Sequence, residues 1–169
     1  KEREKIREAI DSKRLKVEVS DDIIGVQLCA ALKNILAVFV GILDGKKLGD
    51  NTKAYVITKG LEEIKIIGLR MGAKEETFYG LAGMVDLLTT GFGEKSRKRR
   101  FGEKLCSGKT AQEVIKEIGH VVEGAATVKS VMKALISFKK QAPLLSAVND
   151  IVSKRKNPCT ILQKLFNVI

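Results

Sequence analysis

Apolar residues recur at helical spacing along most of this chain, and they alternate with polar residues in only one short segment. That segment, LKVEV at residues 15–19, is rich in valine and predicts a β-strand. The charged amphipathic stretch before it predicts a helix over residues 1–11. Because a single strand cannot satisfy its own hydrogen bonds, we expect residues 15–19 to pair with a sheet that lies outside this sequence.

Glycine, proline and capping residues divide the remainder of the chain into predicted helices. The segment SDD supplies capping oxygens for a long apolar helix, and a capping box joins Thr110 to Glu113. Asn157, followed by a proline, caps the last helix. Glycines interrupt residues 74–90, which predict two short helices, and residues 91–102 predict a basic loop that leads into a helix. Further helices are predicted over 22–43, 50–72, 110–119, 121–138, 143–152 and 157–166.

The composition indicates a helical domain that attracts anions. Hydrophobic residues make up 44% of the 169 residues, which is enough to bury a core. Lysine and arginine number 31 against 20 acidic residues. The resulting net charge of +11 predicts attraction to phosphates, nucleic acid or an acidic membrane surface, without deciding among them.

Cysteine and histidine offer little material for a metal site or for histidine-based catalysis. Cys29, Cys106 and Cys159 are odd in number and lack metal-binding spacing, and His120 is the only histidine. We therefore expect free thiols in a reducing compartment and no zinc site.

The apolar segment from residue 23 to residue 43 has a lysine near its middle. The segment is long enough to span a bilayer, but a central lysine costs about 2.5–3.5 kcal/mol there, so we predict a core helix and no membrane span. Lys33 either extends its ammonium group to the surface or serves a function. Apolar neighbours disfavour the charged form and bring proton exchange toward neutral pH, and the adjacent Asn34 can hydrogen-bond a substrate hydroxyl.

Asp86 is the one carboxylate in the apolar segment GLAGMVDLLTT. It either caps a helix or pairs with some base for structural reasons, or it orients Lys33 for a reaction. The spacing of the sequence does not decide between these interpretations.

A basic segment follows two glycines in GFGEKSRKRRFG. Its arginines can clamp a phosphate, and Ser96 can cap the next helix and offer that helix N-terminus to an anion. Charge runs are commonly solvated loops, and nucleic-acid binding is a further alternative, although only Phe92 and Phe101 supply aromatic interleaving. The GFG opening lacks the third glycine and the leading strand of a dinucleotide fingerprint. The cations of the segment are Lys95, Arg97, Lys98, Arg99 and Arg100.

Four segments together resemble the substrate-binding domain of NAD(P)-dependent glycerol-3-phosphate dehydrogenase. They are GVQLCAALKNILAVFVGILDGKKLGDNTKAYVITKGLEEI, GLAGMVDLLTT, SRKRRFG and VVEG, and the similarity runs in order over about residues 15–160. The resemblance implies an all-α, multi-helix domain of the 6-phosphogluconate dehydrogenase C-terminal-like type over residues 21–169. Residues 1–20 would then be the tail of a Rossmann domain, with its last helix and last strand, and the sequence would be a C-terminal fragment.

The resemblance also implies a reaction, namely hydride transfer between a nicotinamide and C2 of dihydroxyacetone phosphate or glycerol 3-phosphate. Lys33 matches the family's catalytic lysine, which gives a proton to the carbonyl in reduction and takes one from the hydroxyl in oxidation. Lys98 stands where the family usually has asparagine, so a neutral hydrogen-bonding group is replaced by a cation. The implied substrate-binding residues are Lys33, Asn34, Asp86, Ser96, Arg97 and Lys98, and the implied cofactor contacts are Arg97, Val121 and Glu123.

The partners implied by the resemblance are a small phosphorylated three-carbon substrate and NAD or NADP, bound mainly by a domain outside this sequence. No metal, nucleic acid or membrane span is implied, and the protein is expected to be a cytoplasmic homodimer. We expect the isolated segment to bind phosphate weakly and to be catalytically silent. Two alternatives stay open: a basic helical module that binds nucleic acid, and a non-catalytic domain that serves as a dimerisation surface.

Overall fold

The computed structural model describes residues 2–93, 95–118, 128, 133, 136–138 and 140–166. These residues form helices and contain no strand, which confirms the predicted all-α class. The helices are α1 (Glu2–Ile10), α2 (Ile23–Gly45), α3 (Asp50–Arg70), α4 (Glu75–Tyr79), a π-helix (Leu81–Val85), α5 (Asp86–Phe92), α6 (Arg97–Leu105), α7 (Ala111–Ile118), a short 3₁₀-helix (Ile136–Phe138), α9 (Pro143–Val152) and α10 (Pro158–Phe166).

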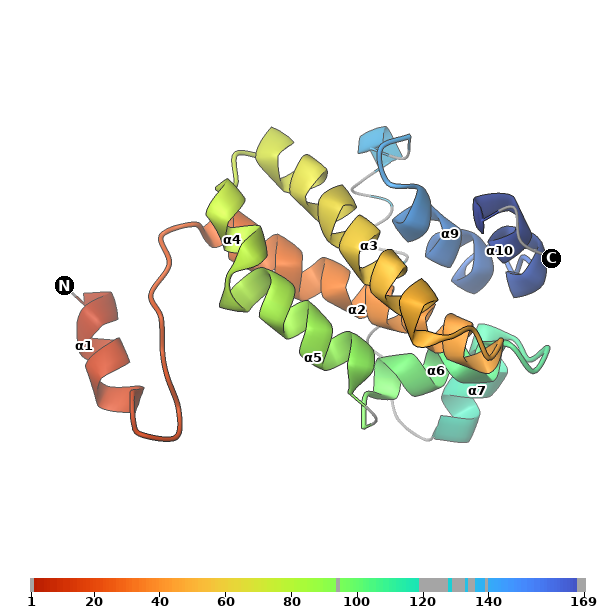
Figure 1. The fold of residues 1–169 in the computed structure, drawn as a ribbon, viewed down its shortest axis with the longest axis horizontal. Coiled ribbons are helices and arrows are strands. Elements are labelled where there is room, and N and C mark those ends of the chain that lie inside the picture. The colour runs from red at the N-terminus through yellow and green to blue at the C-terminus, as the bar shows by residue number, and fades with distance from the viewer. Residues whose placement is uncertain are drawn as a thin grey trace.

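Helix α2 is the centre of the fold, and α3, α5, α6 and α9 pack against it (Figure 1). Every residue from 35 to 43 is buried, because neighbouring helices cover this half of α2 on all sides. By length and composition α2 could cross a membrane, and it is the one helix among the described residues that meets this test. Here it forms the core of a helical domain, as its apolar sequence predicts.

Asp22 fixes the start of α2 and joins it to α4. Its buried carboxylate accepts hydrogen bonds from Gly25 N at 2.8 Å, Lys74 N at 2.9 Å and Thr77 Oγ1 at 2.6 Å. The first bond satisfies an amide that the helix leaves unpaired, and the other two hold the beginning of α4 against α2. The predicted capping role of the SDD segment is therefore confirmed.

Glu63 plays a similar part between α3 and α9. Its side chain is buried and accepts hydrogen bonds from Leu144 N at 2.8 Å and Leu145 N at 3.1 Å, the free amides in the first turn of α9. Burial raises the pKa of Glu63 to about 7, although both backbone donors favour the carboxylate form.

Two glycines allow α6 to cross α2 with the backbones in contact. A Cβ atom added to Gly41 would lie 1.9 Å from the backbone oxygen of Arg99, and one added to Gly102 would lie 2.0 Å from the oxygen of Val38. Neither position can take a side chain without a shift of backbone. The crossing therefore sets where α6 begins relative to α2.

The N-terminal tail extends away from the helix bundle (Figure 1). The predicted helix over residues 1–11 is present as α1, which buries none of its residues. Residues 15–19 run as irregular chain, with Val17 N donating to Asp11 Oδ1 at 2.9 Å instead of to a strand. A ladder needs a second strand, so the pairing of this segment with another sheet stays a prediction.

The remaining boundaries follow the capping signals, with two differences. The capping box is confirmed, because Thr110 N donates to Glu113 Oε2 at 2.7 Å and Glu113 N donates to Thr110 Oγ1 at 3.3 Å.

The predicted basic loop is much shorter than expected: α5 reaches Phe92 and α6 begins at Arg97, so most of the cations lie on a helix. A π-helix stands within the segment 74–90, which predicted only two short helices. The predicted helix over 121–138 falls almost wholly outside the described residues.

Candidate functional site

The structure brings Lys33 and Asp86 together. Lys33 lies in the middle of α2 and Asp86 begins α5, and Lys33 Nζ donates a hydrogen bond to Asp86 Oδ2. The backbone oxygen of Asp86 accepts from Thr90 Oγ1 at 2.7 Å and from Thr89 Oγ1 at 3.1 Å, which steadies the first turn of α5. The geometry thus pairs Asp86 with Lys33, a contact that both the structural and the functional interpretation of Asp86 require.

Lys33 is more accessible than its apolar neighbours suggest. Its side chain is 22% exposed and that of Asp86 is 35% exposed. The N-terminal half of α2 has one uncovered face, on which Ile23, Gln27 and Ala30 follow one another at helical spacing. This partial exposure arises because sequence neighbours on a helix point in different directions, and only some of them face the core.

Asn34 leaves an acceptor unused beside this pair. Its Nδ2 donates to the backbone oxygen of Ala30 at 2.9 Å, and its Oδ1 is buried and receives no hydrogen bond from the described residues. A buried acceptor without a donor is unfavourable. A ligand hydroxyl is one group that would satisfy it.

The π-helix places Asp86 at the site. Val85 N donates to the backbone oxygen of Gly80, five residues earlier, at 3.4 Å, and Asp86 follows directly. Gly83 makes this turn possible, since a Cβ atom there would lie 2.2 Å from the backbone oxygen of Phe78. Single π-turns are frequent at functional sites. The sequence signals only a pair of glycines, which also suit a simple break between helices.

Cys29, one turn before Lys33, is not a reactive group of this site. Its thiol is buried, and burial raises the pKa of Cys29 to about 11, with Asp22 and Asp86 adding to the effect. The thiol therefore stays protonated at neutral pH and serves as a small apolar side chain.

The basic segment contributes side chains of different kinds at the start of α6. Ser96 is the N-cap, and its Oγ accepts from Arg99 N at 3.4 Å. Arg97 is exposed and makes no hydrogen bond or ion pair with the described residues, whereas Lys98 is half-buried and has interaction partners. Arg99 is turned inward and contacts Asp44. The segment is therefore not a uniformly solvated run of charges.

The predicted proton-transfer residues and the predicted phosphate-binding residues lie at different positions along the axis of α2. α5 follows α2 in the same direction, from Asp86 beside Lys33 to Gly91, where an added Cβ atom would lie 3.8 Å from Val40. α6 meets α2 at Gly41, eight residues or about 12 Å beyond Lys33. The structure thus does not bring Ser96 or Arg97 into contact with Lys33, and Val121 and Glu123 lie outside the described residues.

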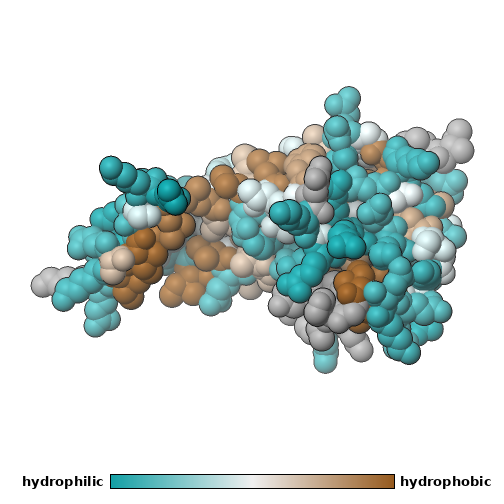
Figure 2. Space-filling model, turned by 90° about the horizontal axis from the view of Figure 1, so that it is seen from below, coloured by the Kyte–Doolittle hydropathy of each residue, from teal (hydrophilic) through white to brown (hydrophobic). Residues whose placement is uncertain are grey.

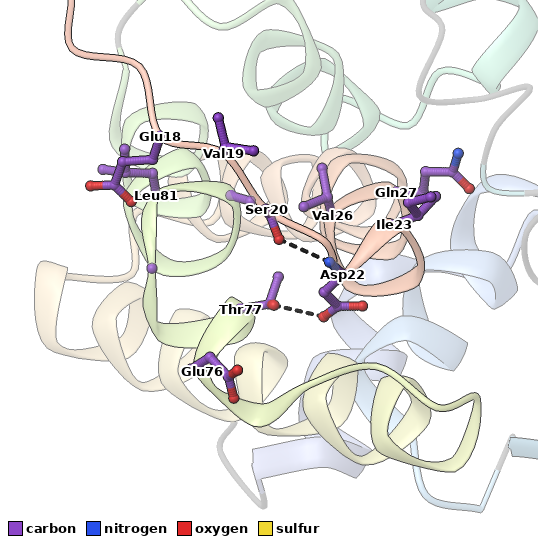
Figure 3. A pocket seen from close by; sticks show the side chains of 12 residues that line it. Glu18, Val19, Ser20, Asp22, Ile23, Val26, Gln27, Glu76, Thr77 and Leu81 are labelled. Carbon is purple, nitrogen blue, oxygen red and sulfur yellow. Dashed lines mark hydrogen bonds between the residues drawn. The ribbon is translucent and has the colours of Figure 1, made fainter. Parts of the chain in front are cut away.

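A pocket of about 520 Å³ opens beside the uncovered face of α2, between the tail and α4 (Figure 3). Asp22, Ile23 and Thr77 are among its lining residues, and Lys33, Asn34 and Asp86 are not. Figure 2 shows apolar side chains gathered toward the N-terminal end of the molecule, where several are exposed on the surface. They are Ile6, Ile10, Leu15, Val19, Ile23, Leu81, Met84, Val85 and Leu88.

Nothing in the described part of the chain forms a group of three metal-ligating side chains. The predicted residues that the structure describes supply an ion-paired lysine, an amide acceptor and a cationic helix start.

Comparison with known proteins gives this arrangement a family. The family model described as "NAD-dependent glycerol-3-phosphate dehydrogenase C-terminus" matches residues 22–163. The chain belongs to this family.

Curated relatives agree with that assignment. A glycerol-3-phosphate dehydrogenase [NAD(P)+] of Fusobacterium nucleatum is 43% identical over 151 residues, which are 89% of this chain and 45% of the relative. The enzyme of the same name from Paucimonas lemoignei is 39% identical over 164 residues, 97% of this chain and 49% of the relative. The chain spans about half the length of the curated relatives it matches.

Solved structures share the fold. Glycerol-3-phosphate dehydrogenase from Coxiella burnetii superposes with a TM-score of 0.91 at 37% identity, covering 98% of this chain and 51% of that one. The enzyme from Saccharomyces cerevisiae gives 0.86 at 30% identity, with 95% of this chain and 47% of that one covered. The resemblance drawn from the sequence is therefore confirmed, both for the family and for its helical domain.

Proposed function

We propose that this chain is the substrate-binding part of an oxidoreductase that interconverts sn-glycerol 3-phosphate and dihydroxyacetone phosphate with NAD or NADP. The observation that carries the proposal is the ion pair of Lys33 and Asp86 on a partly open face of the core helix. The family membership and the names of its relatives support the same reaction.

Lys33 is the general acid and base of the proposed reaction. Its ammonium group donates a proton to the substrate oxygen at C2 during reduction, and its amine takes that proton back during oxidation. Asp86 holds Nζ in one direction and balances its charge. Asn34, whose Oδ1 lacks a donor among the described residues, is proposed to accept a hydrogen bond from a substrate hydroxyl.

The start of α6 is the proposed phosphate site. Arg97 is exposed and uncommitted to the described residues, so its guanidinium group can form two parallel hydrogen bonds to a phosphate. Ser96 begins the helix, whose N-terminus favours an anion. Lys98, in place of the family's usual asparagine, adds a positive charge and removes an acceptor.

Among the described residues, the start of α6 is suited to bind part of a dinucleotide. An unpaired arginine at a helix N-terminus suits a pyrophosphate or phosphate, and Arg97 is that residue. We propose that Val121 and Glu123 also contact the cofactor, and that most of its contacts come from a separate domain to which residues 1–20 belong. When bound, the nicotinamide supplies or accepts the hydride.

We also propose that the protein is a cytoplasmic homodimer. Free cysteines are in keeping with a reducing compartment. Exposed apolar side chains on α3, among them Tyr55 and Leu69, offer surface that a second copy would cover. Nucleic-acid binding has less support, since Arg99 of the basic segment is committed to Asp44 and does not face solvent freely.

The test follows oxidation of NADH and of NADPH by the intact protein on addition of dihydroxyacetone phosphate. Turnover should occur with this substrate, and Asp86→Asn should lower kcat by about 10²-fold or more because the lysine loses its charged partner. Thr89→Ala, which removes a hydroxyl beside Asp86 but not the ion pair, is the matched control and should stay within a few fold. Absence of turnover on every phosphorylated three-carbon substrate would remove the proposed reaction.

A further inference from the structure

Arg99 holds together the three helices that carry the proposed site. Its Nε donates to Asp44 Oδ2 near the end of α2, and its Nη1 donates to the backbone oxygen of Phe92, the last residue of α5, at 2.9 Å. α2 carries Lys33, α5 begins at Asp86 and α6 begins at Arg97. One guanidinium group thus joins the helices of all three proposed site residues.

Arg97 and Arg99 face opposite sides of α6. Two residues on an α-helix are separated by roughly 200° around its axis, so when one side chain faces α2 the other faces away. This matches their surroundings, because Arg99 is 22% exposed and ion-paired while Arg97 is exposed and free of described partners. The two arginines therefore have separate roles, and only Arg97 can meet a ligand.

Asp44 is built to receive a cation. Its side chain is 14% exposed, and besides Arg99 it accepts from Lys53 Nζ at 3.1 Å. Lys53 in turn contacts Asp50 at 2.6 Å. Hydrogen bonds to Asp50, which has the larger effect, and to Asp44 raise the pKa of Lys53. The cluster of Asp44, Lys53 and Arg99 is thus largely shielded from water, where a charge-assisted hydrogen bond is stronger than on an open surface.

We propose that Arg99, anchored by Asp44, is a positioning residue that sets the distance between the phosphate-binding start of α6 and the proton-transferring Lys33. This rests on the proposed function. The Gly41–Gly102 crossing fixes how closely α6 approaches α2, and Arg99 fixes the corner from which Arg97 and Ser96 project. A substrate that must reach both the lysine and the phosphate site is sensitive to that distance.

The proposal predicts an effect specific to the phosphate. Loss of the anchor lets the start of α6 move, so Arg97 meets the phosphate in fewer of its conformations, while the Lys33–Asp86 pair on α2 and α5 keeps its contact. The KM for dihydroxyacetone phosphate should rise by about tenfold to a hundredfold with kcat nearly kept. The kcat/KM for dihydroxyacetone, which has no phosphate, should change less than about twofold because it does not use the α6 contact.

The experiment compares Arg99→Ala, Arg99→Lys and Asp44→Asn with Arg100→Ala in the intact protein. Arg100 is the matched control, an exposed arginine on the same helix with no described partner. Arg99→Lys keeps the charge but cannot contact Asp44 and Phe92 at the same time as a guanidinium group does. Its KM should therefore rise less than that of Arg99→Ala. Inorganic phosphate is also titrated into each variant by calorimetry, and thermal unfolding shows which variants are folded.

A phosphate-specific rise in KM for Arg99→Ala and Asp44→Asn, absent in Arg100→Ala, supports the proposal. Equal losses with dihydroxyacetone, or no difference from Arg100→Ala, overturn it. If Arg99→Ala does not fold, Asp44→Asn decides alone. If the wild-type protein has no turnover, the proposed function fails, and the phosphate titration still judges the positioning role: binding weakened only in the anchor variants supports it, and equal binding refutes it.

Discussion

The two halves of α2 are both apolar in sequence, yet they have opposite surroundings. The half that contains residues 35–43 is buried on every side and meets α6 backbone to backbone. The half before it leaves one face uncovered, and beside that face the partly exposed Lys33 meets Asp86. On the proposed function, one helix then serves both as a rigid support and as a reactive surface, since the supported half holds the neighbouring helices at fixed positions around the open one.

The ion pairs of the two halves differ in the same sense. Asp44, in the supported half, has two cationic partners and little contact with water, whereas Lys33 has one described partner and more exposure. On the proposed function, removing a charge from the first cluster disturbs packing, whereas removing Lys33 removes the group that transfers the proton. Two substitutions in α2 would sharpen or break this division, and a pH titration tests the buried contact of α3 beside it.

The largest effect is expected from Lys33→Ala. The kcat for dihydroxyacetone phosphate should fall by about 10²–10⁴-fold, because the proposed reaction uses Lys33 to exchange the proton. The free energy of unfolding should change by less than about 1 kcal/mol, since a partly exposed ion pair adds little stability. Steady-state kinetics and urea unfolding measure the two quantities. Lys65→Ala is the control, a lysine of similar exposure paired with Glu75, and it should leave kcat unchanged.

Gly41→Ala should act on the supported half by destabilisation. An added methyl group meets the backbone of α6 at 1.9 Å, and such overpacking costs about 1–3 kcal/mol or more despite alanine's better helix propensity. Gly91→Ala is the matched control, because the nearest atom to its methyl group would be the flexible end of the Ile57 side chain, at 3.0 Å. Equal unfolding midpoints for the two variants in urea would contradict the close crossing of α2 and α6.

A smaller effect is expected from pH, acting through Glu63. Its pKa is raised to about 7 in the folded chain from an ordinary 4.5, so the folded state binds a proton more tightly than the unfolded state. The resulting stabilisation is complete below pH 4.5 and is lost as pH rises through 7, and it amounts to something on the order of 1–3 kcal/mol.

Urea unfolding between pH 4.5 and pH 8 measures this contribution. The decline should be shallower in Glu63→Gln, which cannot titrate, and unchanged in Glu62→Gln, an exposed neighbour paired with Lys59. Parallel pH profiles for Glu63→Gln and the wild-type protein would show that the buried carboxyl group is already ionised at acidic pH.

The sequence predicted those features that depend on neighbours along the chain. Helix starts at Asp22 and Thr110 follow from short-range hydrogen bonds, and the structure contains both. Lys33 stands out because an ammonium group in an apolar segment demands an explanation within the helix itself.

Features that depend on how helices meet were not predicted. The sequence alone does not distinguish Arg97 from Arg99. Their different roles follow only from the packing of α2 against one side of α6. The open face beside Lys33 likewise depends on which side α5 leaves uncovered. The assignment of Val121 and Glu123 to the cofactor stays a prediction, since both lie outside the described residues.

The π-helix before α5 sets the rotation of α5 about its own axis. A π-turn holds one residue more than an α-turn, and one residue corresponds to roughly 100° of rotation around the axis. Deleting a single residue between Leu81 and Val85 would preserve the apolar character of the segment, yet it would swing Asp86 away from Lys33 and turn another side of α5 toward the core. The register of the five residues of the π-helix thus decides whether the lysine has a partner.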